Sequence, residues 1–408
     1  MTWRYAHTVE VPVYFDCAAT TPIDPRVRDR VIQFLDSEFG NPGSRTHDFG
    51  LRARKEVEAA RDRIAAAASA GRGEVIFTSG ATESNNLAIL GLAEHGRTSG
   101  KRHLVSTAIE HHAVLEPLRY LTERGFELTL VPPNPGGYLE ASAIRDAVRS
   151  DTLLVSVMHA NNETGVVNPI DQIASLLTNS DAFFHVDAAQ TFGRDIPGVR
   201  NPRVDLISIS GHKIHAPKGI GALIARRRNG HRPPISPIMH GGGQELGLRP
   251  GTLPSHLIAG FGLAVELAIA EAGERAAACL RMRSKLLETL REFKPIYHGY
   301  PDRSMPHVLN FSLPGFDADE VIEPLQPFVA ISTGSACTTQ SITCSHVLGA
   351  MGYDADDVAG ATRWSWCHLT PEPNWDEIAT ALRKLSASAS PTPVVMHGGK
   401  ASQRGATG

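Results

Sequence analysis

Two reactive side chains follow directly on short apolar runs. Lys213 comes just after Val204–Ser210, and Asp187 ends the run that begins at Phe183. A lysine is nucleophilic only when it is neutral, so a desolvated position at the end of a strand suits an imine-forming lysine. A buried aspartate at such a position can hold a proton on a heteroaromatic nitrogen. The alternatives are a solvated surface lysine and an aspartate that caps a helix.

Thr78–Ser84 (TSGATES) and Glu110-His111-His112 also follow apolar runs. The small residues of Thr78–Ser84 would leave backbone N–H groups accessible at a helix N-terminus, which favours a phosphate. The segment is not a P-loop, because the GxxxxGK[ST] pattern is absent, and the alternative is a capped turn. Two adjacent histidines on a helix cannot both face one pocket, so at most one of His111 and His112 is expected to be functional. The alternative for either is a partly buried structural histidine.

The C-terminal half adds a candidate thiol and a candidate anion receptor. Cys337 stands in Ser332–Thr339 (STGSACTT), where glycine and small residues indicate an exposed loop, and an exposed loop cysteine is more often reactive than a buried one. Cys344, seven residues later, is a competing thiol for which no role is the default interpretation. Arg363 suits bidentate recognition of a carboxylate, and its alternative is a surface arginine stacked on a tryptophan.

Alternating helical and strand-like segments between residues 52 and 265 must position these groups. The helical segments are Arg52–Ala70 and Glu83–Glu94, and the short apolar runs are Val75–Thr78, Leu104–Thr107, Leu153–Met158, Phe183–Val186, Leu206–Ile209 and Ile220–Ile224. Apolar strands interleaved with helices predict an α/β fold with a mostly parallel sheet covered on both faces. Such sheets bind ligands outside the carboxyl ends of their strands.

The pattern changes after residue 255. Leu257–Phe293 is one helical region with a possible break near Gly273, followed by strand-like runs and a helix from Trp375 to Leu385. We therefore predict a large domain over residues 22–264 and a smaller α+β domain formed by residues 1–21 and 265–388. Residues 389–408, in a segment rich in Ser, Pro and Gly, are expected to be a disordered tail.

Composition excludes several protein classes. The 408 residues carry 40 basic and 43 acidic side chains, a net charge of −3, so direct nucleic-acid binding is not expected. No apolar run is long enough to span a membrane, and the N-terminus lacks a signal-peptide pattern. Five irregularly spaced cysteines without a CxxC pair predict neither a metal site nor a disulfide framework. We expect a cytoplasmic protein.

Taken together, these motifs resemble the cysteine desulfurases among the class V aminotransferase-like enzymes of pyridoxal 5′-phosphate (PLP). The resemblance covers Val13 to Leu385 and rests on segments in a fixed order: FDCAATTPIDPRV, FGNPGSRTHDFG, FTSGATESNNLAI, IEHHAVLEPL, MHANNETGVV, HVDAAQ, SGHKIHAPKGIGAL, HGGGQELGLRPGTLP and STGSACTT. It implies the type I PLP-dependent transferase fold, with a seven-stranded sheet in the large domain. It also implies a homodimer that converts L-cysteine to L-alanine and delivers the sulfur to an acceptor protein.

The resemblance assigns a role to each candidate. Lys213 would bind PLP covalently, Asp187 would pair with the pyridine nitrogen, Gln190 would bond the phenolic oxygen, and His111 would stack on the ring and assist proton transfer. The phosphate would be held by Ala81, Thr82, Ser210, His212 and, from the partner subunit, Thr252. Asn162 would line the ring and substrate, Arg363 would bind the substrate carboxylate, and Cys337 would accept the sulfur.

The length of the segment between Cys337 and His346 resembles the long-loop branch of the family, whose members hand sulfur directly to partner proteins. The acceptor pathway stays open between iron–sulfur cluster assembly, tRNA thiolation and DNA phosphorothioation. One departure is the sequence around Arg363, where Trp364 and Trp366 are expected to add bulk near the substrate carboxylate. The competing functions are a selenocysteine lyase or aminotransferase on the same fold, and an inactive PLP-fold scaffold that only binds partners.

Overall fold

The computed structural model describes residues 11–194, 197–333 and 345–388. Its centre is a seven-stranded sheet in which β7, β6, β5, β3 and β4 pair in parallel, while β8 runs antiparallel to both β2 and β7. This confirms the prediction of a mostly parallel sheet. In sheet order the strands are β2 (Val75–Thr78), β8 (Gly221–Ala225), β7 (Leu206–Ser210), β6 (Phe183–Asp187), β5 (Thr152–Met158), β3 (His103–Thr107) and β4 (Glu127–Val131).

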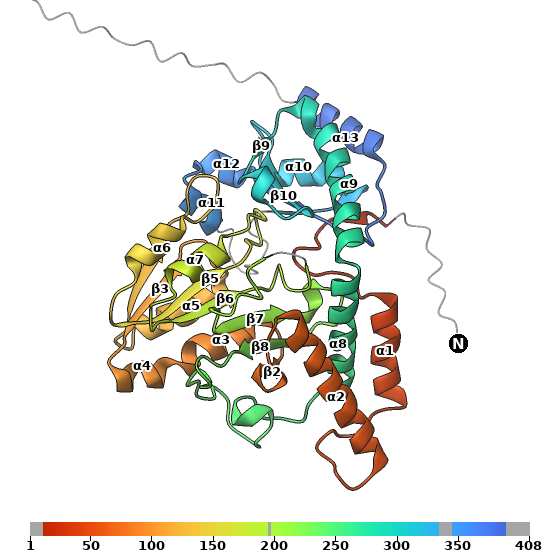
Figure 1. Cartoon of the computed structure of the whole chain (residues 1–408). Helices are drawn as coiled ribbons and strands as arrows, with labels where there is room; N and C mark the ends of the chain where they lie inside the picture. The colour runs from red at the N-terminus through yellow and green to blue at the C-terminus, as the bar shows by residue number, and fades with distance from the viewer. Residues whose placement is uncertain (1–10, 195–196, 334–344, 389–408) are drawn as a thin grey trace, which may run out of the picture.

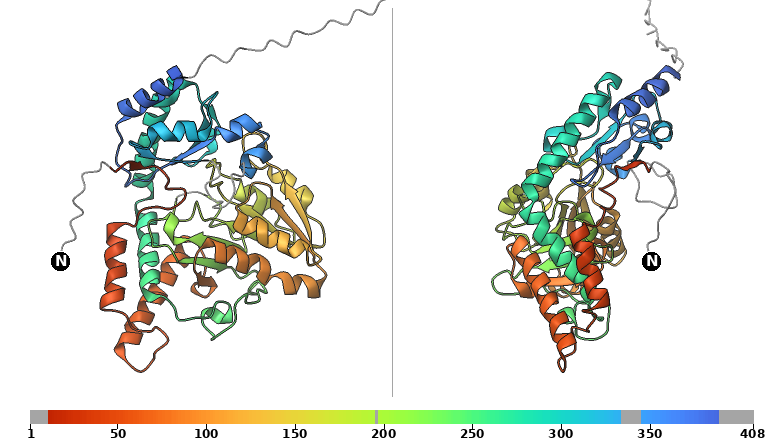
Figure 2. Two further views of the ribbon diagram at one scale, coloured as in Figure 1. Left: turned by 180° about the vertical axis from the view of Figure 1, so that it is seen from behind. Right: turned by 90° about the vertical axis from the view of Figure 1, so that its right-hand side faces the viewer.

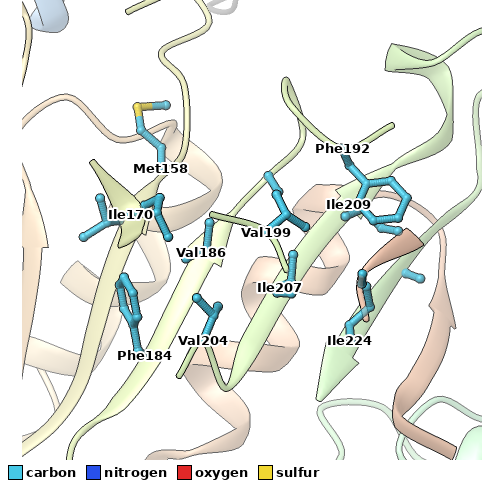
Figure 3. Close-up of a cluster of buried hydrophobic side chains, with 14 of the residues drawn as sticks. Met158, Ile170, Phe184, Val186, Phe192, Val199, Val204, Ile207, Ile209 and Ile224 are labelled. Carbon is cyan, nitrogen blue, oxygen red and sulfur yellow. The ribbon is translucent and has the colours of Figure 1, made fainter. Parts of the chain in front are cut away.

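Helices cover both faces of this sheet because most of its strands are apolar on both sides. Alternate residues of one strand enter different clusters: Phe77 packs with the residues of one face and Ile76 with those of the other. The first face is covered by α2 (Asp48–Ala67), α6 (Ala141–Ala147), α7 (Ile170–Leu176) and α8 (Ser255–Ala270). The second is covered by α3 (Ala81–Gly91) and α5 (His112–Thr122). Figure 3 shows side chains of the first face, among them Val186, Ile207 and Ile224.

A second unit lies at the top of Figure 1. Its four-stranded sheet has the order β12 (Ser332–Thr333), β13 (Thr362–Ser365), β10 (Val308–Ser312) and β9 (Ile296–Tyr297). The N-terminal strand β1 (Val13–Tyr14) pairs in parallel with β11 (Val329–Ala330) and so ties the start of the chain to this unit. Its core is a separate apolar cluster that includes Phe15, Trp364 and Trp366. The domain boundaries themselves stay predictions.

The remaining helices connect or flank these two units. They are α1 (Pro25–Asp36), α4 (Ala93–Ser99), α9 (Ala272–Leu290), α10 (Ala318–Leu325), α11 (His346–Met351), α12 (Ala355–Ala359) and α13 (Trp375–Ser388). Helices α8 and α9 run from the large sheet to the second unit, which the two views of Figure 2 show. They are separated at Glu271, close to the break that the sequence suggested near Gly273.

Among the described residues, no single helix combines the length and the apolarity needed to cross a bilayer. Only the pair Ser255–Ala270 and Ala272–Phe293 meets both criteria when joined, and this pair bends by 74°. The predicted tail at 389–408 lies outside the described residues, as do Cys337 and Cys344.

Candidate active site

A cavity of about 430 Å³ lies at the carboxyl end of the large sheet, and β7, β6, α3 and α5 contribute to its wall. Ten of the residues singled out in the sequence line it, although they come from segments far apart in the chain. These residues are Ala81, Thr82, His111, Asn162, Asp187, Gln190, Ser210, His212, Lys213 and Arg363. The structure therefore brings the candidates together, while their individual roles stay predictions.

One end of the cavity is built to receive an anion. Helix α3 begins at Ala81, and the N–H groups of a first helical turn have no intrahelical partner. Ser210 and His212 face the same cavity. Gly80 and Gly221 approach so closely that a Cβ on Gly221 would stand 2.6 Å from the Gly80 Cα. Gly221 begins β8 and pairs with Ser210 at the end of β7, so this close contact places the start of α3 beside Ser210, and a phosphate fits there.

His212 is neutral at this end of the cavity. Burial, together with the neighbouring charges of Lys213 and Lys218, lowers the pKa of its imidazole to about 4. Its Nδ1 lies 3.2 Å from the Thr20 hydroxyl. A neutral histidine at this position can still donate one N–H to a phosphate oxygen.

Asp187, the last residue of β6, is held in place before any ligand binds. Its Oδ1 accepts the backbone N–H of Ala189 at 2.9 Å, and its Oδ2 accepts the side-chain amide of Asn85 at 2.7 Å. The bond to Ala189 stabilises the turn that follows β6, and Asp187 also lines the cavity. Asn85 Oδ1 is buried without a partner in the described part of the chain. This arrangement suits an aspartate that must face a protonated ring nitrogen.

His111 precedes α5 and has a defined tautomer. Its Nδ1 accepts the backbone N–H of Ala113 at 3.0 Å, so the proton of the neutral ring is on Nε2. Burial lowers the pKa of His111 below its ordinary value; the nearby Asp187 carboxylate opposes this shift and Lys213 adds to it. Its neighbour His112 does not line the cavity, as expected for adjacent residues at a helix start.

Lys213 lies just beyond β7 in the short helix Gly211–Lys213. Its Nζ donates to the backbone carbonyls of Ala18 at 2.5 Å and Ala19 at 2.8 Å. The Ala18 carbonyl also accepts the side-chain amide of Gln190 at 3.0 Å. The N-terminal segment thus holds both polar side chains against one wall of the cavity.

Arg363 lines the cavity from the second unit, whereas the start of α3 belongs to the large sheet. It is 1% exposed and lies on β13, with Nη2 donating to Asp16 Oδ1 at 2.6 Å and Nη1 donating to the Asn162 carbonyl at 3.1 Å. Its Nε is buried without a partner in the described part of the chain. Because a guanidinium carries five N–H donors, Arg363 keeps capacity to bind a carboxylate.

The expectation about the two tryptophans is wrong. Trp364 and Trp366 are fully buried in the apolar core of the second unit, next to Phe15, and neither lines the cavity. Successive side chains of a strand point to opposite faces, so the neighbours of Arg363 in sequence point away from it.

Two further candidates are not placed in the cavity. Thr252 is exposed and does not line it, and its predicted role concerns the site of a partner subunit. Cys337 lies outside the described residues, but both flanks of its segment are described. Thr333 pairs with Thr362, next to Arg363, and the Ser345 hydroxyl donates to the buried Glu163, which follows Asn162. Thr333 and Ser345, the described flanks of this segment, therefore each lie next to a neighbour of a cavity-lining residue.

Sequence reasoning missed Asn85, Asp16 and Lys218. Asn85 stands one helical turn after Ala81 in the segment SGATESNN, and this spacing was a usable signal for a residue on the same face of α3. Lys218 lines the cavity five residues after Lys213. Asp16 offered no such signal, because its partner Arg363 is 347 residues away in sequence.

Comparisons with known proteins agree with this architecture. The aminotransferase class-V family matches residues 13–371. The chain is 41% identical over 386 residues to cysteine desulfurase IscS of Vibrio cholerae serotype O1 (strain M66-2), covering 93% of this chain and 95% of that protein. Among solved structures, DndA from Streptomyces lividans has a TM-score of 0.77 at 45% identity and covers 88% of this chain and 100% of its own. SspA in complex with cysteine has a TM-score of 0.77 at 35% identity, over 88% and 99%.

Proposed function

The chain belongs to the class-V aminotransferase family, in which it is a PLP-dependent cysteine desulfurase, and we propose that the cavity described above is where it takes sulfur from L-cysteine. The predictions of family, fold, enzyme class and cofactor are thereby confirmed. The observation that carries the proposal is that Lys213, Asp187 and Arg363 line one cavity that also contains a helix N-terminus.

These residues fit the cofactor. The N–H groups of Ala81 and Thr82, with Ser210 and His212, would hold its phosphate, and Asp187 would keep the proton on its ring nitrogen. Lys213 would bind it covalently, and Gln190 would bond its phenolic oxygen. When bound, PLP supplies the electron sink that makes the substrate Cα–H acidic.

The chain's own residues would orient the substrate and move its protons. Arg363 would hold the carboxylate of L-cysteine through its free donor capacity, with Asn162 beside it. Lys213 Nζ would remove the proton from the substrate Cα. His111, whose Nε2 carries a proton in the neutral ring, also lines the cavity and would exchange a proton with the substrate.

The sulfur step would use Cys337. Its thiolate attacks the substrate sulfur, a sulfur–sulfur bond forms and the Cβ–S bond breaks with its electron pair left on carbon. Two protons then complete alanine, and Cys337 keeps a persulfide. Cys337 is four residues from Thr333, so their Cα atoms are at most about 14 Å apart in any conformation. Thr333 itself is paired beside Arg363, which supports access of Cys337 to the cavity.

Delivery of the sulfur to an acceptor protein completes the proposal. We further infer a homodimer in which Thr252 of one subunit contributes to the phosphate site of the other, since Thr252 is exposed. A cytoplasmic location fits the three described cysteines, which are all free thiols. The pathway that consumes the sulfur stays open between cluster assembly, tRNA thiolation and DNA phosphorothioation.

The test compares Cys337→Ser with Cys279→Ser, which removes a buried thiol in the second unit. Alanine formation from L-cysteine should fall to background in Cys337→Ser and stay within about twofold of wild type in Cys279→Ser. After one turnover, mass spectrometry of the wild type should find one added sulfur on the peptide of Cys337. Full turnover by Cys337→Ser would reject this sulfur step and favour an aminotransferase. A chain that binds no PLP would favour the inactive scaffold.

A further inference from the structure

A second group of chemically active side chains lies at the junction between the large sheet and the second unit, on residues that the proposed reaction does not use. Each of His215, Cys367 and His368 offers one ligand atom, and these three atoms lie within 4.8 Å of one another. The rings of His215 and His368 meet edge to face with their centroids 4.7 Å apart. His215 and Cys367 are buried and His368 is partly exposed, so an ion would have a path from solvent to the cluster.

Hydrogen bonds already orient the donor atoms. The Nδ1 of His215 lies 3.0 Å from the carbonyl of Pro22, and because a carbonyl only accepts, Nδ1 carries the proton and Nε2 keeps its lone pair. Metal-binding histidines usually donate their other ring N–H to a carbonyl or carboxylate in this way, which fixes the orientation of the ring. The Cys367 sulfur lies 3.5 Å from the Thr370 hydroxyl, which in turn lies 3.9 Å from the Cys17 sulfur. The thiolate form of Cys367 therefore has polar neighbours.

The charges around the cluster permit a cation. Carboxylate oxygens of Asp24 and Glu271 lie within 4.8 Å of a ring nitrogen of His368. Arg26 and Arg275 pair with both of these carboxylates, so these four charges balance, and the buried Arg194 adds a third positive charge near Cys367. The Cys367 thiolate adds a further negative charge at the ligand position itself.

We propose that His215, Cys367 and His368 form a binding site for a divalent transition-metal cation, Zn²⁺ in the first place. One thiolate and two imidazoles are ligands that Zn²⁺ takes readily, and three protein ligands leave a fourth position for water beside the partly exposed His368. The thiol of Cys367 loses its proton to solvent when the ion binds, and no electron is transferred. This site was not predicted from the sequence, because its ligands come from two segments about 150 residues apart and contain no CxxC pair.

Such an ion would tie together parts of the chain that meet at the active cavity. His215 stands two residues after Lys213, and its backbone N–H bonds the Thr21 hydroxyl in the same N-terminal segment whose carbonyls hold Lys213. Cys367 and His368 follow shortly after the strand of Arg363, which ends at Ser365. The ion would therefore stabilise the position of the second unit against the large sheet.

The experiment uses the full chain with PLP bound, carrying Cys337→Ser so that the sulfur-accepting thiol cannot contribute a ligand. After treatment with a chelator and its removal, Zn²⁺ is titrated by calorimetry, and Co²⁺ is added to report a sulfur ligand by its charge-transfer absorption. We expect one equivalent of Zn²⁺ to bind, a thiolate-to-Co²⁺ band to appear, and the Tm to rise with bound Zn²⁺.

Cys367→Ser and His368→Asn, each in the same background, should weaken Zn²⁺ binding at least about 100-fold and abolish the rise in Tm. Cys279→Ser, which removes a buried thiol outside the cluster, should bind Zn²⁺ as the parent does. Far-UV circular dichroism and PLP absorbance of the metal-free variants show that they are folded. Absence of stoichiometric binding in the parent, or equal affinity in the parent and in folded His368→Asn, would overturn the proposal.

Discussion

The two ends of the active cavity are built in different ways. The phosphate end consists of backbone and short side chains from the large sheet, with α3 beginning against the first residue of β8 through the contact of Gly80 and Gly221. The carboxylate end consists of long side chains, with Arg363 of the second unit held by Asp16 and by the carbonyl of Asn162. The phosphate end is therefore preformed by local structure, whereas the carboxylate end depends on how the second unit sits on the sheet.

Substitutions at the two ends of the cavity should therefore affect different ligands. A change at the carboxylate end should act on the substrate and leave the cofactor bound, because Arg363 is separate from the phosphate site. A change at the phosphate end should act on the cofactor first. Substitutions at each end can therefore separate the two.

The largest effect in this comparison is expected for Arg363→Lys. Lysine keeps the charge but cannot bond Asp16, the Asn162 carbonyl and a substrate carboxylate in one plane. Loss of charge-assisted hydrogen bonds should lower kcat/KM for L-cysteine about 30- to 100-fold, mainly through KM. Steady-state alanine formation measures this, and PLP absorbance should be unchanged.

Arg283→Lys is the matched control for that variant. Arg283 is also a buried arginine of the second unit, and its guanidinium bonds the carbonyl of Val308 at 2.7 Å, away from the cavity. It should leave KM within about twofold of wild type. An equal rise in KM in both variants would show that the docking of the second unit, and not recognition by Arg363, determines substrate binding.

A smaller effect, on the cofactor, is expected for Gly221→Ala. The added Cβ would stand 2.6 Å from the Gly80 Cα and 2.5 Å from the Ile209 carbonyl oxygen, so the start of α3 must move away from the first residue of β8. Overpacking of this kind costs about 1–3 kcal/mol, which predicts a rise in the PLP dissociation constant of about 10-fold. Gly243→Ala has open space around the added Cβ and should bind PLP normally. Normal PLP binding by Gly221→Ala would contradict the assignment of the phosphate site to the start of α3.

The smallest effect on catalysis is expected for Glu163→Gln. This substitution should instead change how the free energy of unfolding depends on pH. Burial raises the pKa of Glu163 to about 7, while Ser345 and Arg363 partly oppose the shift. In the unfolded state Glu163 loses its proton near its ordinary pKa, whereas in the folded state it keeps the proton up to about pH 7. The free energy of unfolding therefore falls as the pH rises from about 5 to 7.

The amide of Glu163→Gln resembles the protonated acid. The variant should match the wild type at pH 5 and exceed its free energy of unfolding by about 1–3 kcal/mol at pH 8. Urea unfolding at the two pH values measures the difference. A difference that is the same at both values would mean that Glu163 is ionised in the folded protein throughout this range.

The phosphate end was predictable from sequence because its signals are local. A helix start after a strand, as at Ala81, and a lysine after a strand, as at Lys213, are visible in short segments, and parallel strands bring their carboxyl ends to one edge. The sheet itself was predicted for the same reason, since apolar runs such as Leu153–Met158 match β5 closely.

The carboxylate end was only partly predictable. Arg363 was singled out, but its pairing with Asp16 depends on the docking of segments from opposite ends of the chain. The direction of Trp364 and Trp366 was misjudged because sequence neighbours on a strand were treated as spatial neighbours. The pleat of β13 turns Arg363 to the cavity and the tryptophans to the core.

The most direct test of the whole account is the position of the covalent link to PLP. Two lysines line the cavity, Lys213 and Lys218, and only Lys213 is held by the carbonyls of Ala18 and Ala19. Reduction of the resting enzyme with borohydride, followed by digestion and mass spectrometry, should find the cofactor on the peptide at Lys213, and Lys213→Ala should lose both the link and activity by at least about 10³-fold. Finding the cofactor on Lys218, or an active Lys213→Ala enzyme, would contradict the account.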